Sequence, residues 1–100
     1  MQQISALSLK VRLQAGEQLN LLDVREELEF HTCNIGGQNL TLSKLTEEMD
    51  DINANKNDEL IVICKAGMRS TTAQALLIAK GYTNVKNLTG GLLALQRLPV

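Results

Sequence analysis

One cysteine stands where its thiol could become a nucleophile. Cys64 directly follows an apolar run at residues 60–63, and Gly67 and Arg69 come soon after it. In a loop that enters a helix, backbone N–H groups and the helix dipole create positive potential, which favours a thiolate over a thiol. The alternative is a buried core thiol without chemistry, which is a common role for free cysteine. The combination of strand end, glycine and helix start favours the reactive thiol.

The residues after Cys64 could hold an anion that is delivered to it. Gly67 lets the backbone curl without a Cβ clash, and Lys65 and Arg69 add positive charge. The N–H groups of residues 66–70 could each point to one centre, as in other anion-binding loops. The predicted substrate-binding residues are Lys65, Ala66, Gly67, Met68, Arg69 and Ser70.

Strands and helices are predicted to alternate around this loop. Strands are expected at residues 4–6, 19–24, 60–63 and 85–88, with loops at 34–39 and 50–58. Helices are expected at residues 9–15 behind a Ser8 cap, at 26–31 with Leu28 facing inward, and at 92–98. Two further helices are expected, one from Thr41 or Ser43 and one from Ser70 or Thr71 to Lys80.

This alternation predicts an α/β fold, a small and mostly parallel sheet with helices on both faces. Ligands of such sheets lie beyond the carboxyl ends of the strands, which is where Asp23 and Cys64 stand. Asp23 and Arg25 are predicted to support the site as an ion pair, or Arg25 could instead pair with Glu29.

Three motifs in order resemble the rhodanese-like family. The run Cys64-Lys65-Ala66-Gly67-Met68-Arg69-Ser70 resembles the family's active-site loop, Cys-x-x-Gly-x-Arg-Ser. The segment at residues 22–26 with Glu29-Phe30 resembles its early D-V-R-E…E-F motif, and residues 81–92 resemble its glycine-rich tail. The resemblance covers nearly the whole chain.

The resemblance implies a sulfurtransferase in which Cys64 carries sulfur as a persulfide. Cys64 would take a sulfane sulfur from thiosulfate or from a protein persulfide and pass it to a thiophilic acceptor, as in thiosulfate:cyanide sulfurtransfer. No metal and no organic cofactor would be needed. Such domains also occur behind adenylating enzymes, so the chain could belong to a longer fusion protein.

Two positions depart from the family pattern, and two others offer competing chemistry. Asn34 and Leu95 stand where the family usually has His and Trp, and we expect these changes to affect packing more than chemistry. His31 is predicted to be an exposed bystander, because transfer from a thiolate needs no separate base. Cys33 is predicted to be an idle or packed thiol.

Composition limits the remaining function classes. The 100 residues suit one domain, 1–100, and a net charge of -1 gives no general attraction for nucleic acid or an anionic membrane. Two widely separated cysteines predict neither a disulfide framework nor a zinc site. With no signal-peptide pattern at its start, the chain is expected in the cytoplasm.

Two other functions compete with sulfur transfer. A catalytically silent rhodanese-like module could serve only to bind proteins, but the intact Cys64, Gly67 and Arg69 argue against it. A cysteine phosphatase or arsenate reductase also uses a Cys…Arg loop before a helix. Its signature has about five residues between Cys and Arg, whereas only residues 65–68 separate them here.

Overall fold

Five parallel strands form one sheet in the order β1-β5-β4-β2-β3. The structure is a computed structural model that describes residues 1–99. The strands are β1 (Gln2–Ile4), β2 (Leu21–Asp23), β3 (Gln38–Asn39), β4 (Leu60–Ile63) and β5 (Val85–Leu88). The predicted α/β class is confirmed, and β4 and β5 have the predicted bounds.

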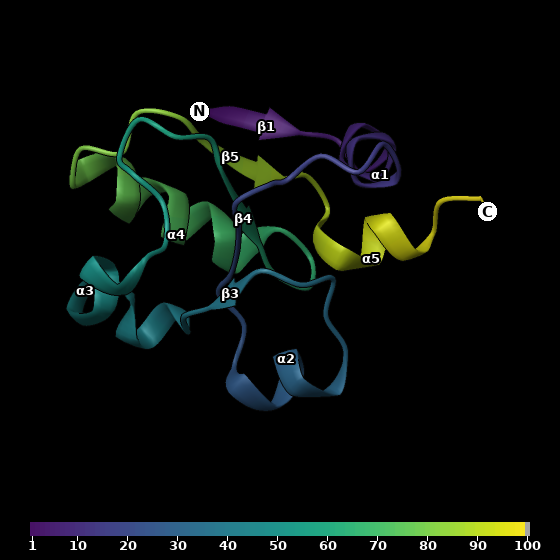
Figure 1. Ribbon diagram of the computed structural model, residues 1–100. Coiled ribbons are helices and arrows are strands. Elements are labelled where there is room, and N and C mark those ends of the chain that lie inside the picture. The colour runs from purple at the N-terminus through teal and green to yellow at the C-terminus, as the bar shows by residue number, and fades with distance from the viewer. Residues whose placement is uncertain (100) are drawn as a thin grey trace.

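Helices cover both faces of this sheet (Figure 1). Helices α1 (Ala6–Gln14) and α5 (Gly91–Gln96) lie together on one face. Helix α4 (Met68–Ala79) covers the other face with α3 (Leu45–Glu48) and the 3-10 turns Leu42–Lys44 and Met49–Asp51. Helix α2 (Glu27–Thr32) projects beyond the sheet. No helix within residues 1–99 has the length and apolar character needed to cross a membrane.

The central strand β4 divides the core into two halves, because neighbouring side chains on a strand point to opposite faces. Leu60 and Val62 join the cluster on the α4 side, and Cys64 continues their alternation. Ile61 and Ile63 join the cluster beneath α1 and α5. All four aliphatic side chains are at most 2% exposed, and each contributes roughly 1.5–3 kcal/mol by burial. Cys64 is therefore directed to the side of the sheet on which α4 begins.

Two predicted helix starts are wrong. Helix α1 begins at Ala6 rather than Leu9, because the Ser5 hydroxyl accepts a hydrogen bond from the Ser8 N–H at 3.0 Å and caps the helix. Helix α4 begins at Met68, directly after Gly67, and not at Ser70 or Thr71. Ser70 therefore lies inside the first turn, where its side chain is buried.

The segment between β2 and α3 also differs from the prediction. Leu28 was expected to face inward, but it is 79% exposed, and the face of α2 toward α4 carries Glu29 instead. Gln38 and Asn39, expected in a loop, form the short edge strand β3. Ile52, expected in an exposed connection, is buried in the core on the α4 side.

Candidate active site

The Cys64 sulfur lies at the carboxyl end of β4, inside the loop that enters α4. Cys64 is 1% exposed, and the Gly67 N–H donates a hydrogen bond to Sγ at 3.0 Å. The Ser70 hydroxyl lies 3.2 Å from the same sulfur. The loop thus brings a backbone donor and a hydroxyl to one buried thiol.

Hydrogen bonds in this loop favour the ionised form of Cys64. Burial alone would raise the pKa of the thiol, because it removes water from the charged form. The Ser70 hydroxyl and the backbone N–H groups of Ser70, Gly67 and Ala66 act in the opposite direction and outweigh burial, so the pKa is lowered. A thiol with a lowered pKa is a better nucleophile near neutral pH.

The start of α5 makes backbone hydrogen bonds to the same loop. The N–H groups of Leu92 and Leu93 donate to the carbonyl oxygens of Cys64 and Lys65, at 2.9 and 3.0 Å. Gly91 allows this approach, since a Cβ at that position would lie 2.5 Å from the Cys64 and Lys65 carbonyl oxygens. The loop is thus held between the starts of α4 and α5.

Arg69 reaches across the mouth of the loop to α2. Its guanidinium contacts both carboxylate oxygens of Glu29, at 2.6 and 3.0 Å. The bond to Arg69 lowers the pKa of Glu29 to about 2. Arg69 also lies close enough to Cys64 for the two to interact electrostatically. Lys65 and Ala66 are exposed on the same loop, and Met68 is exposed at the first position of α4.

Asp23 and Arg25 pair with each other and not with Glu29. Arg25 donates to both Asp23 carboxylate oxygens at 2.8–3.1 Å, and both side chains are buried. The Arg25 guanidinium also donates to the Cys33 carbonyl at 2.6 Å, and the Asn39 side chain donates to the carbonyls of Asp23 and Arg25. These contacts tie the end of β2 to the segment after α2.

The family model for the rhodanese-like domain matches residues 5–98. The chain belongs to the rhodanese-like family. A sulfurtransferase of Allochromatium vinosum is 33% identical over 101 residues, which are 98% of this chain and 92% of that protein. The human single-domain sulfurtransferase superimposes with a TM-score of 0.79 at 26% identity and covers 99% of both chains. Sulfur transfer is the role that these relatives share.

A further relative is longer than this rhodanese-like domain. The Bacillus subtilis protein YrkF, whose name describes a sulfur carrier, is 32% identical over 91 residues. The match takes in 90% of this chain but only 48% of YrkF. The chain therefore spans about half the length of that relative.

Four residues that the sequence drew attention to lie away from the sulfur of this rhodanese-like domain. His31 and Cys33 are exposed in and after α2, and Cys33 is a free thiol. Asn34 closes the end of α2, where its side chain donates to the Phe30 carbonyl and accepts from the Gly36 N–H, each at 2.8 Å. Leu95 packs, partly buried, against the core beneath α1.

Three residues important to the site were not predicted as such. Gly91 was interpreted only as part of the family's glycine-rich tail before the last helix, and Glu29 only as a family motif residue and an alternative partner for Arg25. Asn87 drew no attention, although it is a polar residue in the middle of a strand and is only 4% exposed. A buried amide in a predicted core strand was the available signal, because such groups require hydrogen-bond partners.

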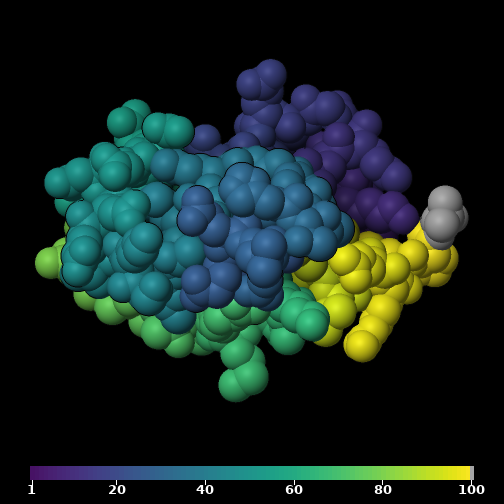
Figure 2. Space-filling view, turned by 90° about the horizontal axis from the view of Figure 1, so that it is seen from below, coloured from purple at the N-terminus to yellow at the C-terminus, as the bar shows by residue number. Residues whose placement is uncertain are grey.

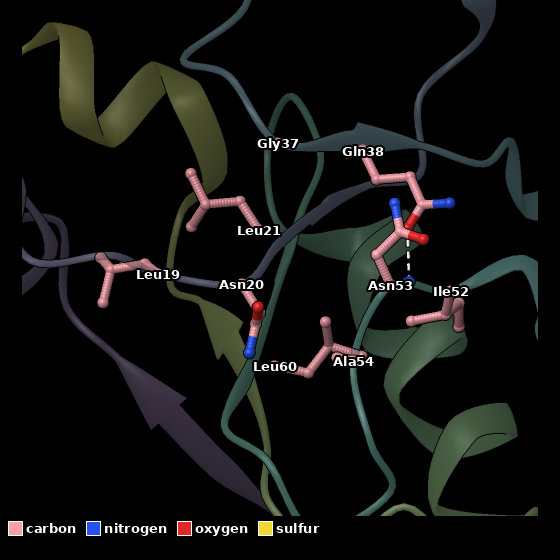
Figure 3. A pocket seen from close by; sticks show the side chains of 9 residues that line it. All are labelled: Leu19, Asn20, Leu21, Gly37, Gln38, Ile52, Asn53, Ala54 and Leu60. Carbon is pink, nitrogen blue, oxygen red and sulfur yellow. Dashed lines mark hydrogen bonds between the residues drawn. The ribbon is translucent and has the colours of Figure 1, made fainter.

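The rhodanese-like domain also has a cavity of about 400 Å³ at the opposite end of the sheet (Figure 3). Its walls come from the starts of β2, β3 and β4 and from residues 52–54, and the Asn53 N–H donates to the Gln38 side chain at its rim. The lining residues are Leu19, Asn20, Leu21, Gly37, Gln38, Ile52, Asn53, Ala54 and Leu60. None of these side chains is nucleophilic or titratable.

Proposed function

We propose that Cys64 is the sulfur carrier of this sulfurtransferase. The observation that carries the proposal is the Cys64 Sγ itself, which is buried at the end of β4, receives the Gly67 N–H at 3.0 Å and has a lowered pKa. Such a thiolate is stabilised in place and shielded from bulk water, which suits a nucleophile that must hold a reactive sulfur atom.

The proposed reaction has two steps. In the first, the Cys64 thiolate attacks the sulfane sulfur of thiosulfate; an S–S bond to Cys64 forms, the bond to the sulfonyl sulfur breaks, and sulfite leaves with the electron pair. In the second, a thiophilic nucleophile such as cyanide attacks the outer sulfur of the persulfide. The S–S bond breaks, thiocyanate forms, and the electron pair returns to Cys64 as the thiolate.

The loop residues have separate tasks in this proposal. The N–H groups of Ala66, Gly67 and Ser70 stabilise negative charge on sulfur, while Met68 and Arg69 extend the same first turn of α4. Lys65 and Arg69 attract an anionic donor to the mouth of the loop. Asp23 and Arg25 support the site indirectly, by fixing the segment beside it.

Loop size favours sulfur over phosphate. Only the four residues 65–68 separate Cys64 from Arg69, so the anion-binding loop is small. The hydrogen bonds of α5 to the Cys64 and Lys65 carbonyls keep the loop in this conformation. A transferred phosphoryl group brings three oxygens that all need donors, whereas an outer sulfur is a single atom. Asp23, the acid that a phosphatase could use, is paired with Arg25.

The physiological donor and acceptor can be small molecules or proteins within this proposal. Lys65, exposed on the loop, suits thiosulfate or another small anion. A protein persulfide is the second candidate donor, because the side chains of Met68 and Leu28 are 80% and 79% exposed, and each directly precedes one member of the Arg69–Glu29 pair in sequence. The name of YrkF, a sulfur carrier, supports a protein partner as well.

Mass spectrometry with two matched variants tests the proposal. After incubation with thiosulfate, the wild type and Cys33→Ser should each gain the mass of one sulfur atom, and Cys64→Ser should gain none. The same preparations should transfer sulfur to cyanide and hydrolyse an aryl phosphate only at trace rates. An adduct on Cys33, or robust phosphatase activity that depends on Cys64, would overturn the assignment.

A further inference from the structure

A chain of buried polar groups leads from the Cys64 sulfur to β5. The Ser70 hydroxyl lies 3.2 Å from Sγ and also donates to the side-chain Oδ1 of Asn87. Cys64, Ser70 and Asn87 are each at most 4% exposed, so solvent offers these groups no ready alternative partner. Asn87 comes from the middle of β5, an element outside the loop.

The neighbours of Asn87 fix which way its amide points. Its Nδ2 lies 3.1 Å from the Thr71 hydroxyl oxygen and 3.4 Å from the Gly67 carbonyl. The Thr71 hydroxyl donates its own proton to the Gly67 carbonyl at 2.7 Å, so toward Asn87 it acts as an acceptor. Both groups therefore require the NH₂ side of the amide, and Oδ1, which carries no proton, is left facing Ser70.

This orientation gives Ser70 one proton and two acceptors. A serine hydroxyl has a single O–H donor. When the Ser70 O–H donates a hydrogen bond to Asn87 Oδ1, the oxygen lone pairs of Ser70 face the sulfur, and the thiol S–H can donate to them. When Cys64 is a thiolate, the sulfur needs a donor, and the Ser70 O–H can supply it only by turning away from Asn87.

We propose that Asn87 is a positioning residue that competes with Cys64 for the Ser70 proton. The thiol state is S–H···Oγ–H···Oδ1. On ionisation the thiol proton goes to solvent, the Ser70 hydroxyl turns to Sγ, and Asn87 Oδ1 loses its donor. Asn87 therefore holds back the ionisation that Ser70 promotes, and it couples the charge on the sulfur to β5. The inference deepens the proposed function, because it concerns the same thiolate.

The charged groups near the sulfur do not replace this competition. Arg69 and Lys65 belong to the loop and α4, Glu29 neutralises Arg69 from α2, and Asp23 and Arg25 pair at the end of β2. The start of α5 contributes uncharged backbone N–H groups. None of these groups shares a proton with Ser70 in the described contacts. Their effect on the pKa of Cys64 should therefore be the same in each of the variants described below.

Two substitutions in one hydrogen-bond chain should act in opposite directions. In a Cys33→Ser background, the ultraviolet absorbance of the thiolate is followed against pH. Asn87→Leu should free Ser70 for the sulfur and lower the pKa of Cys64, while Ser70→Ala should raise it. Below the pKa, the thiolate fraction should change roughly two- to tenfold in each direction, the range expected for one hydrogen bond.

The double variant and the wild type supply the decisive controls. With Ser70→Ala already present, Asn87→Leu should leave the pKa of Cys64 unchanged, because no proton is left to compete for. If Asn87→Leu fails to fold, Asn87→Ala replaces it, and the Asn87 side-chain amide signals of the wild type should titrate in NMR together with Cys64. A raised pKa in the single Asn87 variant, or an equal shift without Ser70, would overturn the inference.

These outcomes are independent of the proposed function. The pKa of Cys64 is measured without any sulfur donor, and sulfur loading is measured by mass. A chain that loads sulfur but shows no opposed pKa shifts would contradict only the inference. A chain that shows opposed shifts but loads no sulfur would contradict only the sulfur-carrier assignment.

Discussion

The starts of α4 and α5 use the same local device for different purposes. Each helix follows a glycine with positive φ, 96° at Gly67 and 74° at Gly90, and each directs free N–H groups at the Cys64 loop. The start of α4 directs them at the sulfur, whereas the start of α5 directs them at the carbonyl oxygens of Cys64 and Lys65. One helix start stabilises charge, and the other fixes the backbone that surrounds it.

The backbone contacts made by the start of α5 allow the start of α4 to stabilise charge on the sulfur. In a trans peptide the C=O and N–H point in opposite directions. Since the Lys65 carbonyl is bonded to the Leu93 N–H, the N–H of the same peptide, which belongs to Ala66, must point away from α5. That N–H is one of the groups that lower the pKa of Cys64. Helix α5 thus orients a donor of the site without contacting the sulfur.

The two helix starts lie around one face of the molecule, together with α2. Figure 2 shows this face, with the blue α2 segment in the middle, green atoms that include the start of α4 along its edge, and the yellow α5 at one side. Because one helix start contacts the sulfur and the other contacts the backbone of the loop, substitutions at the two starts should separate structural support of the loop from sulfur chemistry.

The largest effect is expected from Gly91→Ala at the start of α5. The new Cβ would lie 2.5 Å from three backbone atoms of Cys64 and Lys65, at a φ of +63°. Left-handed strain and overpacking together should cost about 2–5 kcal/mol of unfolding free energy. Denaturant unfolding should show this loss, and sulfur transfer should fall with it because the Ala66 N–H is no longer held in place.

Gly16→Ala is the matched control for this substitution. Gly16 has a similar φ of +79°, but a Cβ there would meet nothing within 4 Å. It should therefore cost only the backbone strain, about 1–2 kcal/mol, with sulfur transfer unchanged. Equal losses in the two variants would contradict a specific bracing role for α5.

The sequence predicted the parts of the molecule in which one local signal decides the structure. An unbroken apolar run predicted the bounds of β4, and Gly81 as a stop signal predicted the end of α4 near Lys80, which is the C-cap residue of that helix. The mutual pairing of Asp23 and Arg25 was one of the two predicted alternatives, and their closeness in sequence at the end of a strand suggested it.

Structural features that depend on residues far apart in the sequence could not be predicted from local sequence signals. Strand β3 consists of Gln38 and Asn39, which pair with β2 residues 16 positions away in sequence. Leu28 was assigned inward because it is apolar, but a six-residue helix is oriented by Glu29 and its contact with Arg69, 40 residues away in sequence. The buried position of Asn87 follows from Ser70 and Thr71, which β5 meets only in three dimensions.

An intermediate effect is expected from the pH dependence of stability. The pKa of Cys64 is lower in the folded chain than the value of 9.0 for a free thiol. Between these two pKa values the unfolded chain binds the extra proton, so the unfolding free energy should rise with pH across that window and level off above about 9. Cys64→Ser, measured under reducing conditions, should lack the rise. A rise of the same size in both proteins would mean that the start of α4 does not stabilise the thiolate.

The smallest stability effect is expected from Glu29→Gln, which releases Arg69 beside the start of α4. The two side chains of this ion pair are 37% and 32% exposed, so solvent screens it and its loss should cost less than about 1 kcal/mol. The Glu29 pKa of about 2 lies below its ordinary 4.5, so this small contribution is present above pH 4.5 and is lost as pH falls toward 2.

The effect of Glu29→Gln on kinetics should be clearer than its effect on stability. A carboxylate that occupies the Arg69 guanidinium competes with an anionic donor for it, so its removal should lower the KM for thiosulfate with little change in kcat, while Arg69→Ala should raise that KM. Glu17→Gln, which breaks the exposed pair with Arg12 instead, should change neither constant. A raised KM in Glu29→Gln would mean that Glu29 holds Arg69 in the orientation that the donor requires, and the ion pair would then belong to the binding site rather than compete with it.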